Sequence, residues 1–232
     1  MHLTLLGTGT SQGIPVIGCQ CEVCQSSDPK DKRLRTAAIF HNDNIHVAID
    51  CGPDFRQQML QNRITQLDAI LITHTHNDHI VGLDDVRPFN FSLNRSIPIY
   101  GLKEHLEEIK KRFDYVFSAN PYPGAPRLNL HPIAPYVPFM IKGQSIIPLP
   151  VKHGSLDVLG FRVDEKAYIT DTNGIPERTM SELHDLEVLV LDALHHRKHH
   201  SHFNFEEAIQ VAQQINADRT YFIHLSHHMG LH

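Results

Sequence analysis

The residues of this chain best suited to chemistry are four metal-binding side chains within six positions. Residues 74–79 read HTHNDH and directly follow the apolar run DAILIT at 68–73. Neutral imidazoles and a carboxylate are ligands that zinc-type ions prefer, and a chain leaving a strand can turn several side chains toward one point. A divalent ion also generates hydroxide at neutral pH. The spacing therefore predicts a metal site, with ligands enough for two ions, rather than an ordinary polar loop.

A second group of ligand-type residues lies near the start of the chain. Cys19, Cys21 and Cys24 form a C-x-C-x2-C pattern, and Cys51 is the fourth cysteine. Disulfides are rare in reducing compartments, and the first two cysteines are poorly spaced for one. Three thiolates lacking one ligand are typical of a structural zinc completed by a distant histidine, while a redox-active pair or idle thiols are the alternatives. Cys51 ends an apolar run and is expected to be buried.

Composition and charge limit the class of protein. The chain has 232 residues, of which 41% are hydrophobic, and we expect residues 1–232 to form a single domain with a full core. The net charge of −5 gives no overall basic field for nucleic acid. The apolar runs are strand-sized, and the N-terminus lacks the features of a secretion signal. We therefore expect a cytoplasmic protein that does not enter a membrane.

Strand-sized apolar runs alternate with helical patterns along the chain. We predict strands at 2–6, 36–40, 45–50, 69–73, 97–100, 145–152, 160–164, 167–170, 186–192 and 219–224, and helices at 55–63, 103–112, 176–183 and 205–215. Asn204 is expected to cap the last helix. The proline-rich residues 120–138 are expected to form a loop or short edge strands. Two mixed β-runs, each with helices, predict an α/β protein in which two packed sheets are covered by helices, an αββα sandwich.

Ligand-type residues also follow three predicted strands in the second half of the chain. His153, Asp171 and His224 each stand at the end of an apolar run. A single residue of this kind is most often an ordinary turn or capping residue. Three of them, together with the histidine-rich loop, predict that loops at one edge of the sheets bring the side chains together.

These motifs together resemble the ligand series of the metallo-β-lactamase superfamily. The matching residues are His74, His76, Asp78, His79, His153, Asp171 and His224, with Asp50 in the superfamily's first motif. Within the superfamily, the chain is most similar to the phosphoribosyl 1,2-cyclic phosphate phosphodiesterases of the carbon–phosphorus lyase pathway. The segments that carry this similarity are GTGTSQG at 7–13, the three-cysteine pattern, TDTNGIPE at 170–177 and HLSH at 224–227. Pyrroloquinoline-quinone accessory proteins and tRNA 3′-processing endonucleases share parts of the same pattern.

The resemblance implies an active site with two divalent ions, zinc or manganese, bridged by Asp171. One ion would be held by His74, His76 and His153, and the other by Asp78, His79 and His224, while Asp50 would orient the histidine loop. A carboxylate rather than a cysteine at the bridging position favours phosphoester chemistry over β-lactam hydrolysis. The implied reaction is attack on phosphorus by a hydroxide held between the two ions.

The resemblance also implies roles for residues outside the ligand set. His202 matches a general acid that protonates the leaving oxygen, and Asp192 matches the acidic partner that keeps it protonated and oriented. The alternative is a strand cap and a loop histidine. With the ligand Asp78, these are the residues expected to act in catalysis. His227 matches the histidine that completes the cysteine-bound structural zinc.

Two basic features of the sequence are weaker indications of function than the ligand-type residues. Arg87 is a candidate for gripping a substrate phosphate. The loop 195–200, which reads HHRKHH, is expected to be a solvated loop near the mouth of the site.

The expected function is that of a metal-dependent phosphodiesterase acting on a small phosphodiester, such as a cyclic ribosyl phosphate. A tRNA 3′-processing nuclease is the first alternative, disfavoured by the acidic charge and the lack of a basic arm. A metal-binding accessory protein of cofactor biosynthesis is the second.

Two features depart from the family pattern: residues 102–138 form an insertion-like region, and the chain stops at His232, where the family continues for about another strand. The sequence leaves the substrate, the metal and a homodimer open.

Overall fold

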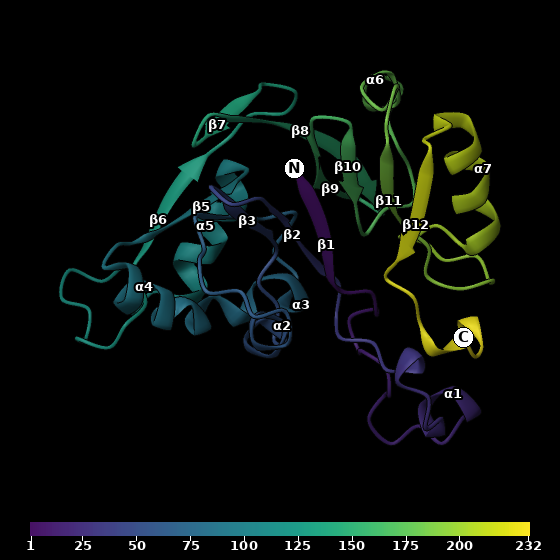
Figure 1. The fold of residues 1–232 in the computed structure, drawn as a ribbon, viewed down its shortest axis with the longest axis horizontal. Coiled ribbons are helices and arrows are strands. Elements are labelled where there is room, and N and C mark those ends of the chain that lie inside the picture. The colour runs from purple at the N-terminus through teal and green to yellow at the C-terminus, as the bar shows by residue number, and fades with distance from the viewer.

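Two six-stranded sheets lie face to face in the computed structural model, which describes residues 1–232. The strand order is β1-β2-β3-β4-β5-β6 in the first sheet and β12-β11-β10-β9-β8-β7 in the second. Helices α2 to α5 lie against the first sheet, and α6 and α7 lie against the second (Figure 1). The predicted αββα sandwich is confirmed. None of the helices combines the length and apolar character needed to span a bilayer.

The first sheet and its helices come from the first 132 residues. Its strands are β1 (His2–Gly7), β2 (Ala37–His41), β3 (His46–Ile49), β4 (Ala69–Leu71), β5 (Ile97–Gly101) and β6 (Leu128–Pro132). The helices of this half are α1 (Glu22–Gln25), η1 (Pro29–Asp31), α2 (Phe55–Gln61), α3 (Asn77–Ile80), η2 (Val81–Val86), α4 (Arg87–Leu93) and α5 (Lys103–Arg112). Strands β1 to β3 pair antiparallel, and β3 to β6 pair parallel.

The second sheet repeats this mixed pairing. Its strands are β7 (Phe139–Ile141), β8 (Gln144–His153), β9 (Leu156–Val163), β10 (Lys166–Ile169), β11 (Val188–Asp192) and β12 (Arg219–Ile223). Its helices are α6 (Glu177–Ser181), α7 (Phe205–Ile215) and η3 (His227–Met229). Strands β7 to β10 pair antiparallel, whereas β10, β11 and β12 pair parallel.

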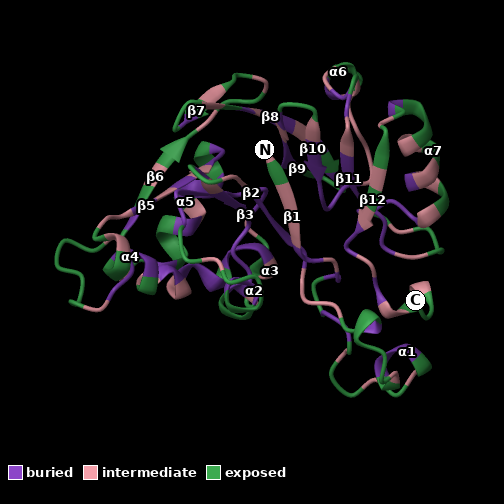
Figure 2. Ribbon diagram, in the orientation of Figure 1, coloured by how far each residue is buried: buried purple, intermediate pink, exposed green.

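Alternation of side chains along the strands fills three hydrophobic layers. In β2, Ala38 and Phe40 belong to the layer between the sheets, whereas Ile39 packs into the layer beneath the helices of the first sheet. A third layer lies between the second sheet and its helices. Because the central strands are covered on both faces, most of their residues are apolar, and Figure 2 shows them buried while the outer helix faces are exposed.

Most predicted elements are found, and the differences have local causes. Helices α5 and α7 have the predicted bounds, and Asn204 caps α7 in a reciprocal capping box with Glu207. Helix α4 was not predicted, since it is short and begins with a proline in its first turn rather than with an apolar repeat. Strand β6 lies within residues 120–138 as a short edge strand, which is one of the two forms expected there.

The loops that follow the strands meet at one edge of the sandwich. Strands β3 and β4 run parallel, as do β10, β11 and β12, so each set releases its following residues at one end. The two sheets are joined there by a backbone hydrogen bond of 3.0 Å from Leu159 N to Thr73 O. The residues after β4 are those of the histidine-rich loop, which therefore faces the strand exits of the second sheet.

Two glycines allow the backbone to pack closely beneath that loop. A Cβ atom on Gly52 would lie 1.9 Å from the carbonyl oxygen of Asp78, and one on Gly82 would lie 2.0 Å from the carbonyl oxygen of Gly52. Cys51 N donates to His79 O at 2.7 Å, and this contact fixes the distance between α3 and the sheet. Only glycine fits at these two positions.

We expect Gly52→Ala to destabilise the protein by about 3 kcal/mol, because its methyl group would have to displace backbone rather than a flexible side chain. Thermal unfolding should show a midpoint lower by about 6–12 °C. Gly174→Ala is the matched control, since its Cβ would meet only the Cβ of Lys152 at an ordinary 3.7 Å. Equal midpoints for the two variants would contradict this packing argument.

Candidate active site

The predicted ligands lie in two groups that share Asp171. One group contains His74, His76, His153 and Asp171, and the other contains Asp78, His79, His224 and Asp171. Within each group, one ligand atom from every residue lies within 4.8 Å of the others, close enough for all to contact one metal ion. The membership is the one that the resemblance implied, so the geometry is consistent with the predicted two-metal site.

Three residues at the centre of the site adopt an unusual backbone conformation. Asp50, Asp171 and His224 have φ angles of 64°, 49° and 61°, in the left-handed region that non-glycine residues rarely enter. Each follows a strand closely, and the sharp turn carries its side chain into the space between the strand exits. Such strain costs free energy and is typical of functional sites.

Hydrogen bonds at Nδ1 set the proton positions of two histidines in the first group. Thr73 Oγ1 donates to Asp50 Oδ2 at 2.8 Å and accepts from Nδ1 of His74 at 3.0 Å. His153 Nδ1 donates to the carbonyl oxygen of Ser201 at 2.7 Å. In both rings the proton is therefore on Nδ1, so Nε2 keeps its lone pair, as a metal ligand requires. The lone pair of His74 Nε2 faces Nδ1 of His76 at 2.9 Å.

The second group contains buried nitrogen atoms that have no hydrogen-bond partner. His79 Nδ1 donates to Asp50 Oδ2 at 2.6 Å, while its Nε2 lies 3.2 Å from Asp78 Oδ2 and 3.4 Å from Asp171 Oδ1 without a hydrogen bond to either. Both ring nitrogens of His224 are also unpartnered, and its Nε2 lies 3.3 Å from Asp171 Oδ2. Buried nitrogens that face carboxylate oxygens need a proton or a metal ion between them. The donor set therefore fits a divalent metal ion.

The electrostatics of the site lead to the same conclusion. Burial opposes charge on His79, but the carboxylates of Asp171, Asp50 and Asp78 outweigh it and raise the pKa of the imidazole well above its usual value. Burial likewise opposes charge on Asp171, but His224 and His79 hold the pKa of its carboxyl well below the usual range. The site thus gathers buried negative charge that needs positive charge close by, which protonated imidazoles supply without metal and divalent ions would supply when bound.

The predicted catalytic pair lies directly beside both groups. His202 Nδ1 lies 3.1 Å from Asp192 Oδ2, and its ring stacks on His224 with 4.5 Å between the ring centroids. The ring centroid of His153 lies 4.6 Å from that of His202. Burial lowers the pKa of His202 and raises that of Asp192. The contact therefore orients the imidazole and leaves Nε2 free. Burial favours the neutral ring of His202, whereas the resemblance implied that Asp192 keeps this ring protonated.

The three-cysteine pattern forms a separate group with His227. Nδ1 of His227 lies 3.3, 3.4 and 3.5 Å from the Sγ atoms of Cys19, Cys21 and Cys24. A backbone hydrogen bond from Cys24 and the side chain of His227 lower the pKa of Cys21 to about 6, which favours its thiolate. Three sulfurs and one imidazole fit a structural zinc site. Such a site would join α1 to the segment that follows β12, which lie next to each other in Figure 1.

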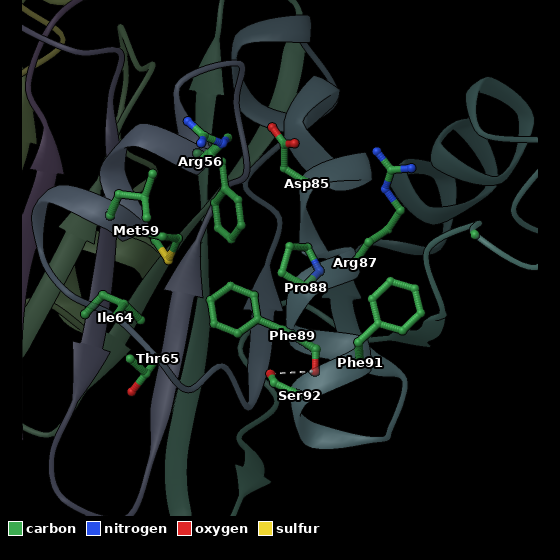
Figure 3. Close-up of a pocket in the computed structure, with 13 residues that line it drawn as sticks. Arg56, Met59, Ile64, Thr65, Asp85, Arg87, Pro88, Phe89, Phe91 and Ser92 are labelled. Atoms are coloured by element: carbon green, nitrogen blue, oxygen red, sulfur yellow. Dashed lines mark hydrogen bonds between the residues drawn. The ribbon is translucent and has the colours of Figure 1, made fainter.

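Arg87 lines a cavity that does not include the ligand-type residues. Its Nη2 lies 2.6 Å from Asp84 Oδ2, and it lines a cavity of about 830 Å³ between α2 and α4. Figure 3 shows the arginine at the rim of this cavity, with Met59 and Phe89 among the apolar residues of its wall. No residue that lines the cavity belongs to either ligand group. The predicted grip of Arg87 on a substrate phosphate stays a prediction.

Sequence reasoning overlooked the residues that hold the ligands in place. Thr73 and Ser201 each fix the proton position of a ligand histidine, and Arg112 Nη1 donates to Asn77 Oδ1 at 2.9 Å, which holds the histidine loop against α5. Only Thr73 had a signal in the sequence, because it directly precedes the loop. The other two contacts join segments that are distant in the chain.

Comparisons with known proteins identify relatives of the same fold. The sequence model of the beta-lactamase superfamily domain matches residues 46–225. A solved structure, a new diphosphatase from the PhnP family, is 40% identical and superposes with a TM-score of 0.91, covering 97% of this chain and 86% of that one. Zn²⁺-bound PqqB from Methylobacterium extorquens is 18% identical with a TM-score of 0.79, covering 97% and 89%, which shows a common fold.

A curated relative is longer than this chain. The octanoyltransferase of Porphyromonas gingivalis strain W83 is 42% identical over 234 residues, which cover 100% of this chain but 47% of the relative. The chain thus spans about half of that protein's length, and the transferase activity is that of the longer protein.

We expect Cys21→Ser to release one zinc per chain and to lower the thermal midpoint, because a hydroxyl group is a poor replacement for a thiolate ligand. Zinc is counted by elemental analysis of the purified protein, and unfolding is followed by circular dichroism. Glu22→Gln is the control, since it changes the neighbouring exposed side chain and leaves all four ligands in place. Unchanged zinc in the Cys21 variant would rule out the structural site.

We expect Asp50→Asn to weaken metal binding by about 10–100-fold, because the amide no longer fixes the proton position of His79. The measurement is zinc retention against a series of chelators, with the thiolate-bound zinc as internal reference. Asp164→Asn, at an exposed carboxylate away from both groups, is the control. If both variants retain zinc equally, Asp50 does not support the site.

Proposed function

Because the chain belongs to the beta-lactamase superfamily and is closely related to the PhnP family, we propose that it is a metal-dependent hydrolase of small phosphodiesters. The observation that carries this proposal is the pair of ligand groups sharing Asp171, with His202 beside both. When bound, divalent ions would supply Lewis-acid stabilisation of phosphoryl oxygens and would lower the pKa of water. The proposed ligands are His74, His76 and His153 for one ion, Asp78, His79 and His224 for the other, and Asp171 for both.

The role we assign to His202 is to protonate the leaving oxygen. Its Nδ1 faces the Asp192 carboxylate, so Nε2 is the atom that would carry the transferred proton. The ring is held between His153 and His224, which fixes its direction before substrate arrives. Burial lowers its pKa, which disfavours the protonated ring at rest but makes that ring a stronger acid toward a developing alkoxide. Positioning and proton transfer are thus the contributions of the protein's own side chains.

The proposed substrate is a small phosphodiester, such as a cyclic ribosyl phosphate. A second candidate reaction is hydrolysis of a diphosphate, which is favoured by 40% identity to the PhnP-family diphosphatase over 97% of the chain. Both reactions expel an oxygen from phosphorus, so the same ligands and the same acid would serve either one.

Other functions have weaker support. The net charge of −5 disfavours a tRNA-processing nuclease. An accessory protein that only binds metal would not need a buried histidine–aspartate pair beside the ligands. Acyl transfer is not proposed, because the chain covers 47% of the octanoyltransferase to which it is similar.

The direct test uses the zinc- or manganese-loaded protein with ribose 1,2-cyclic phosphate 5-phosphate and, separately, with a dinucleoside diphosphate. Phosphorus NMR identifies the bond that breaks, and precursor tRNA serves as the nuclease control. Opening of the cyclic ester supports the proposed phosphodiesterase, whereas cleavage of the diphosphate alone favours the second candidate. Full metal occupancy without turnover of any substrate would contradict a hydrolytic function of this kind.

We expect His202→Ala to lower kcat about 10²–10⁴-fold for an ester with an alkoxide leaving group, because the proton donor is lost. The loss should be much smaller for bis(p-nitrophenyl) phosphate, whose leaving group needs no proton. Steady-state kinetics on both esters, with metal content measured in each preparation, checks this. His184→Ala, at an exposed histidine that belongs to neither ligand group, is the control. Equal losses on the two esters would exclude a general-acid role.

A further inference from the structure

The lobe that carries the three cysteines has almost no hydrophobic core of its own. Its apolar cluster contains three buried residues, Ile14, Val23 and Cys24, whereas each of the three main layers contains between 13 and 21. Figure 1 shows α1 and its flanking loops set apart from both sheets. A cluster of this size does not hold a lobe together unaided, so the lobe depends on the bonds that its sulfur atoms make.

The side chains of the thiolate group differ in their access to solvent. One ligand atom from each of Cys19, Cys21, Cys24 and His227 lies within 4.8 Å of the others. Cys19 and Cys21 are partly exposed, whereas Cys24 is buried, and none of the three forms a disulfide. A small oxidant can therefore reach a sulfur atom that has a second thiol directly beside it.

The spacing of the cysteines selects one pair. Cys19 and Cys21 are separated by a single residue, which is poor geometry for a disulfide. Cys21 and Cys24 are separated by two residues at the start of α1, where Gln25 N donates to Cys21 O at 3.0 Å. This C-x2-C spacing is that of redox-active thiol pairs. Val16 N also donates to Cys24 Sγ at 3.3 Å, which keeps the buried sulfur beside Cys21.

A short segment connects this lobe to the active site. His227 and the ligand-type residue His224 are the two ends of residues 224–227. Between them, Leu225 O accepts from Thr10 N at 3.0 Å, and Thr10 belongs to the loop that leads to the cysteines. His224 has a φ angle of 61°, so its backbone needs support from both sides. Release of His227 would leave one end of the segment free.

We propose that Cys21 and Cys24 form a peroxide-sensitive pair, whose oxidation to a disulfide dismantles the thiolate site and loosens His224. The structural zinc site and the redox-active pair, which the sequence leaves as alternatives, are then two states of the same side chains. The assignment goes beyond the proposed function, since it concerns a site of modification and holds for any reaction at the two ligand groups.

The oxidation balances with a peroxide as the co-reactant. The thiolate of Cys21 attacks one oxygen of hydrogen peroxide, the O–O bond breaks and hydroxide leaves, so Cys21 becomes a sulfenic acid. The thiolate of Cys24 then attacks that sulfur, forms the S–S bond and expels a second hydroxide. Two protons from solvent convert both hydroxides to water, and two electrons pass from sulfur to oxygen. Cys19 and His227 remain, and two ligands bind zinc far more weakly than four.

The first test detects the disulfide and the zinc without any turnover. Full-length, zinc-loaded protein is treated with hydrogen peroxide, separated from small molecules, and analysed by peptide mapping and elemental analysis. We expect a disulfide between Cys21 and Cys24, the loss of one zinc per chain, and reversal of both changes by dithiothreitol and zinc. Zinc retained under conditions that oxidise free cysteine, or zinc lost without a disulfide, would overturn the proposal.

Three variants identify the reacting sulfur atoms. Cys21→Ser, which is expected to lack this zinc already, should lose no further zinc to peroxide. Cys21→His offers an imidazole in place of the partly exposed thiol, so it keeps four ligands without the reacting pair and should lose zinc about tenfold more slowly. Cys51→Ala is the matched control at a buried cysteine outside the group, and it should respond as the wild type does. Equal rates for Cys21→His and the wild type would contradict the assignment of the pair.

The second test measures the effect on the ligand groups. Oxidised and reduced protein are compared by zinc retention against a series of chelators. We expect one of the two ions at the ligand groups to be held about tenfold more weakly in the oxidised protein and to regain its affinity on reduction. Unchanged retention of both ions would contradict the connection through His224.

The oxidised protein should keep its far-UV circular dichroism spectrum, because none of Cys19, Cys21 and Cys24 belongs to the three main hydrophobic layers. Global unfolding on oxidation would contradict a local change at the thiolate site. All of these measurements report zinc, disulfide content or structure, so failure of the proposed hydrolysis and failure of this pair give different results.

Discussion

The carboxylate of Asp171, buried between two groups of ligands, is the constraint on which the site depends. Its oxygens lie 3.4 Å from His79 Nε2 and 3.3 Å from His224 Nε2, in a region that already holds the carboxylates of Asp50 and Asp78. An isolated buried charge is strongly unfavourable, so this arrangement requires compensating positive charge. The groups that meet around this carboxylate come from the strand exits of both sheets. Asp171 and His224 adopt a left-handed backbone there, which strains the chain locally.

The partner of each Nδ1 atom decides what a histidine in this region can do. Where Nδ1 donates, to Asp50 from His79 or to Ser201 from His153, the ring offers a lone pair inward. Where a backbone N–H donates to Nδ1, as at His195 and His199, the ring offers a proton instead. The surrounding backbone thus fixes the proton positions of these rings, so residues of one type can offer either a lone pair or a proton in this region.

The grouping of the ligand-type residues could be predicted from the sequence because chemistry and periodicity coincide there. Polar residues at the ends of apolar runs must lie at strand exits, and the superfamily pattern supplied their grouping. The periodic helices α5 and α7 were predicted for a similar reason. The hydrogen bond between His153 and Ser201 joins residues 48 positions apart, and the separation of Arg87 from the ligands depends on the packing of α4. Such details arise from tertiary packing, which local pattern does not encode.

The thiolate group and the active site share one short segment, and this connects their stabilities. His224 and His227 are three residues apart, and Leu225 between them exchanges backbone hydrogen bonds with the loop after β1: its N donates to Thr8 O at 2.9 Å, and its O accepts from Thr10 N at 3.0 Å. The cysteines lie further along that same loop. A zinc held by Cys19, Cys21, Cys24 and His227 would therefore fix both sides of the pairing that positions His224. Because His224 has a strained backbone, it depends on such support more than a ligand on a regular strand would.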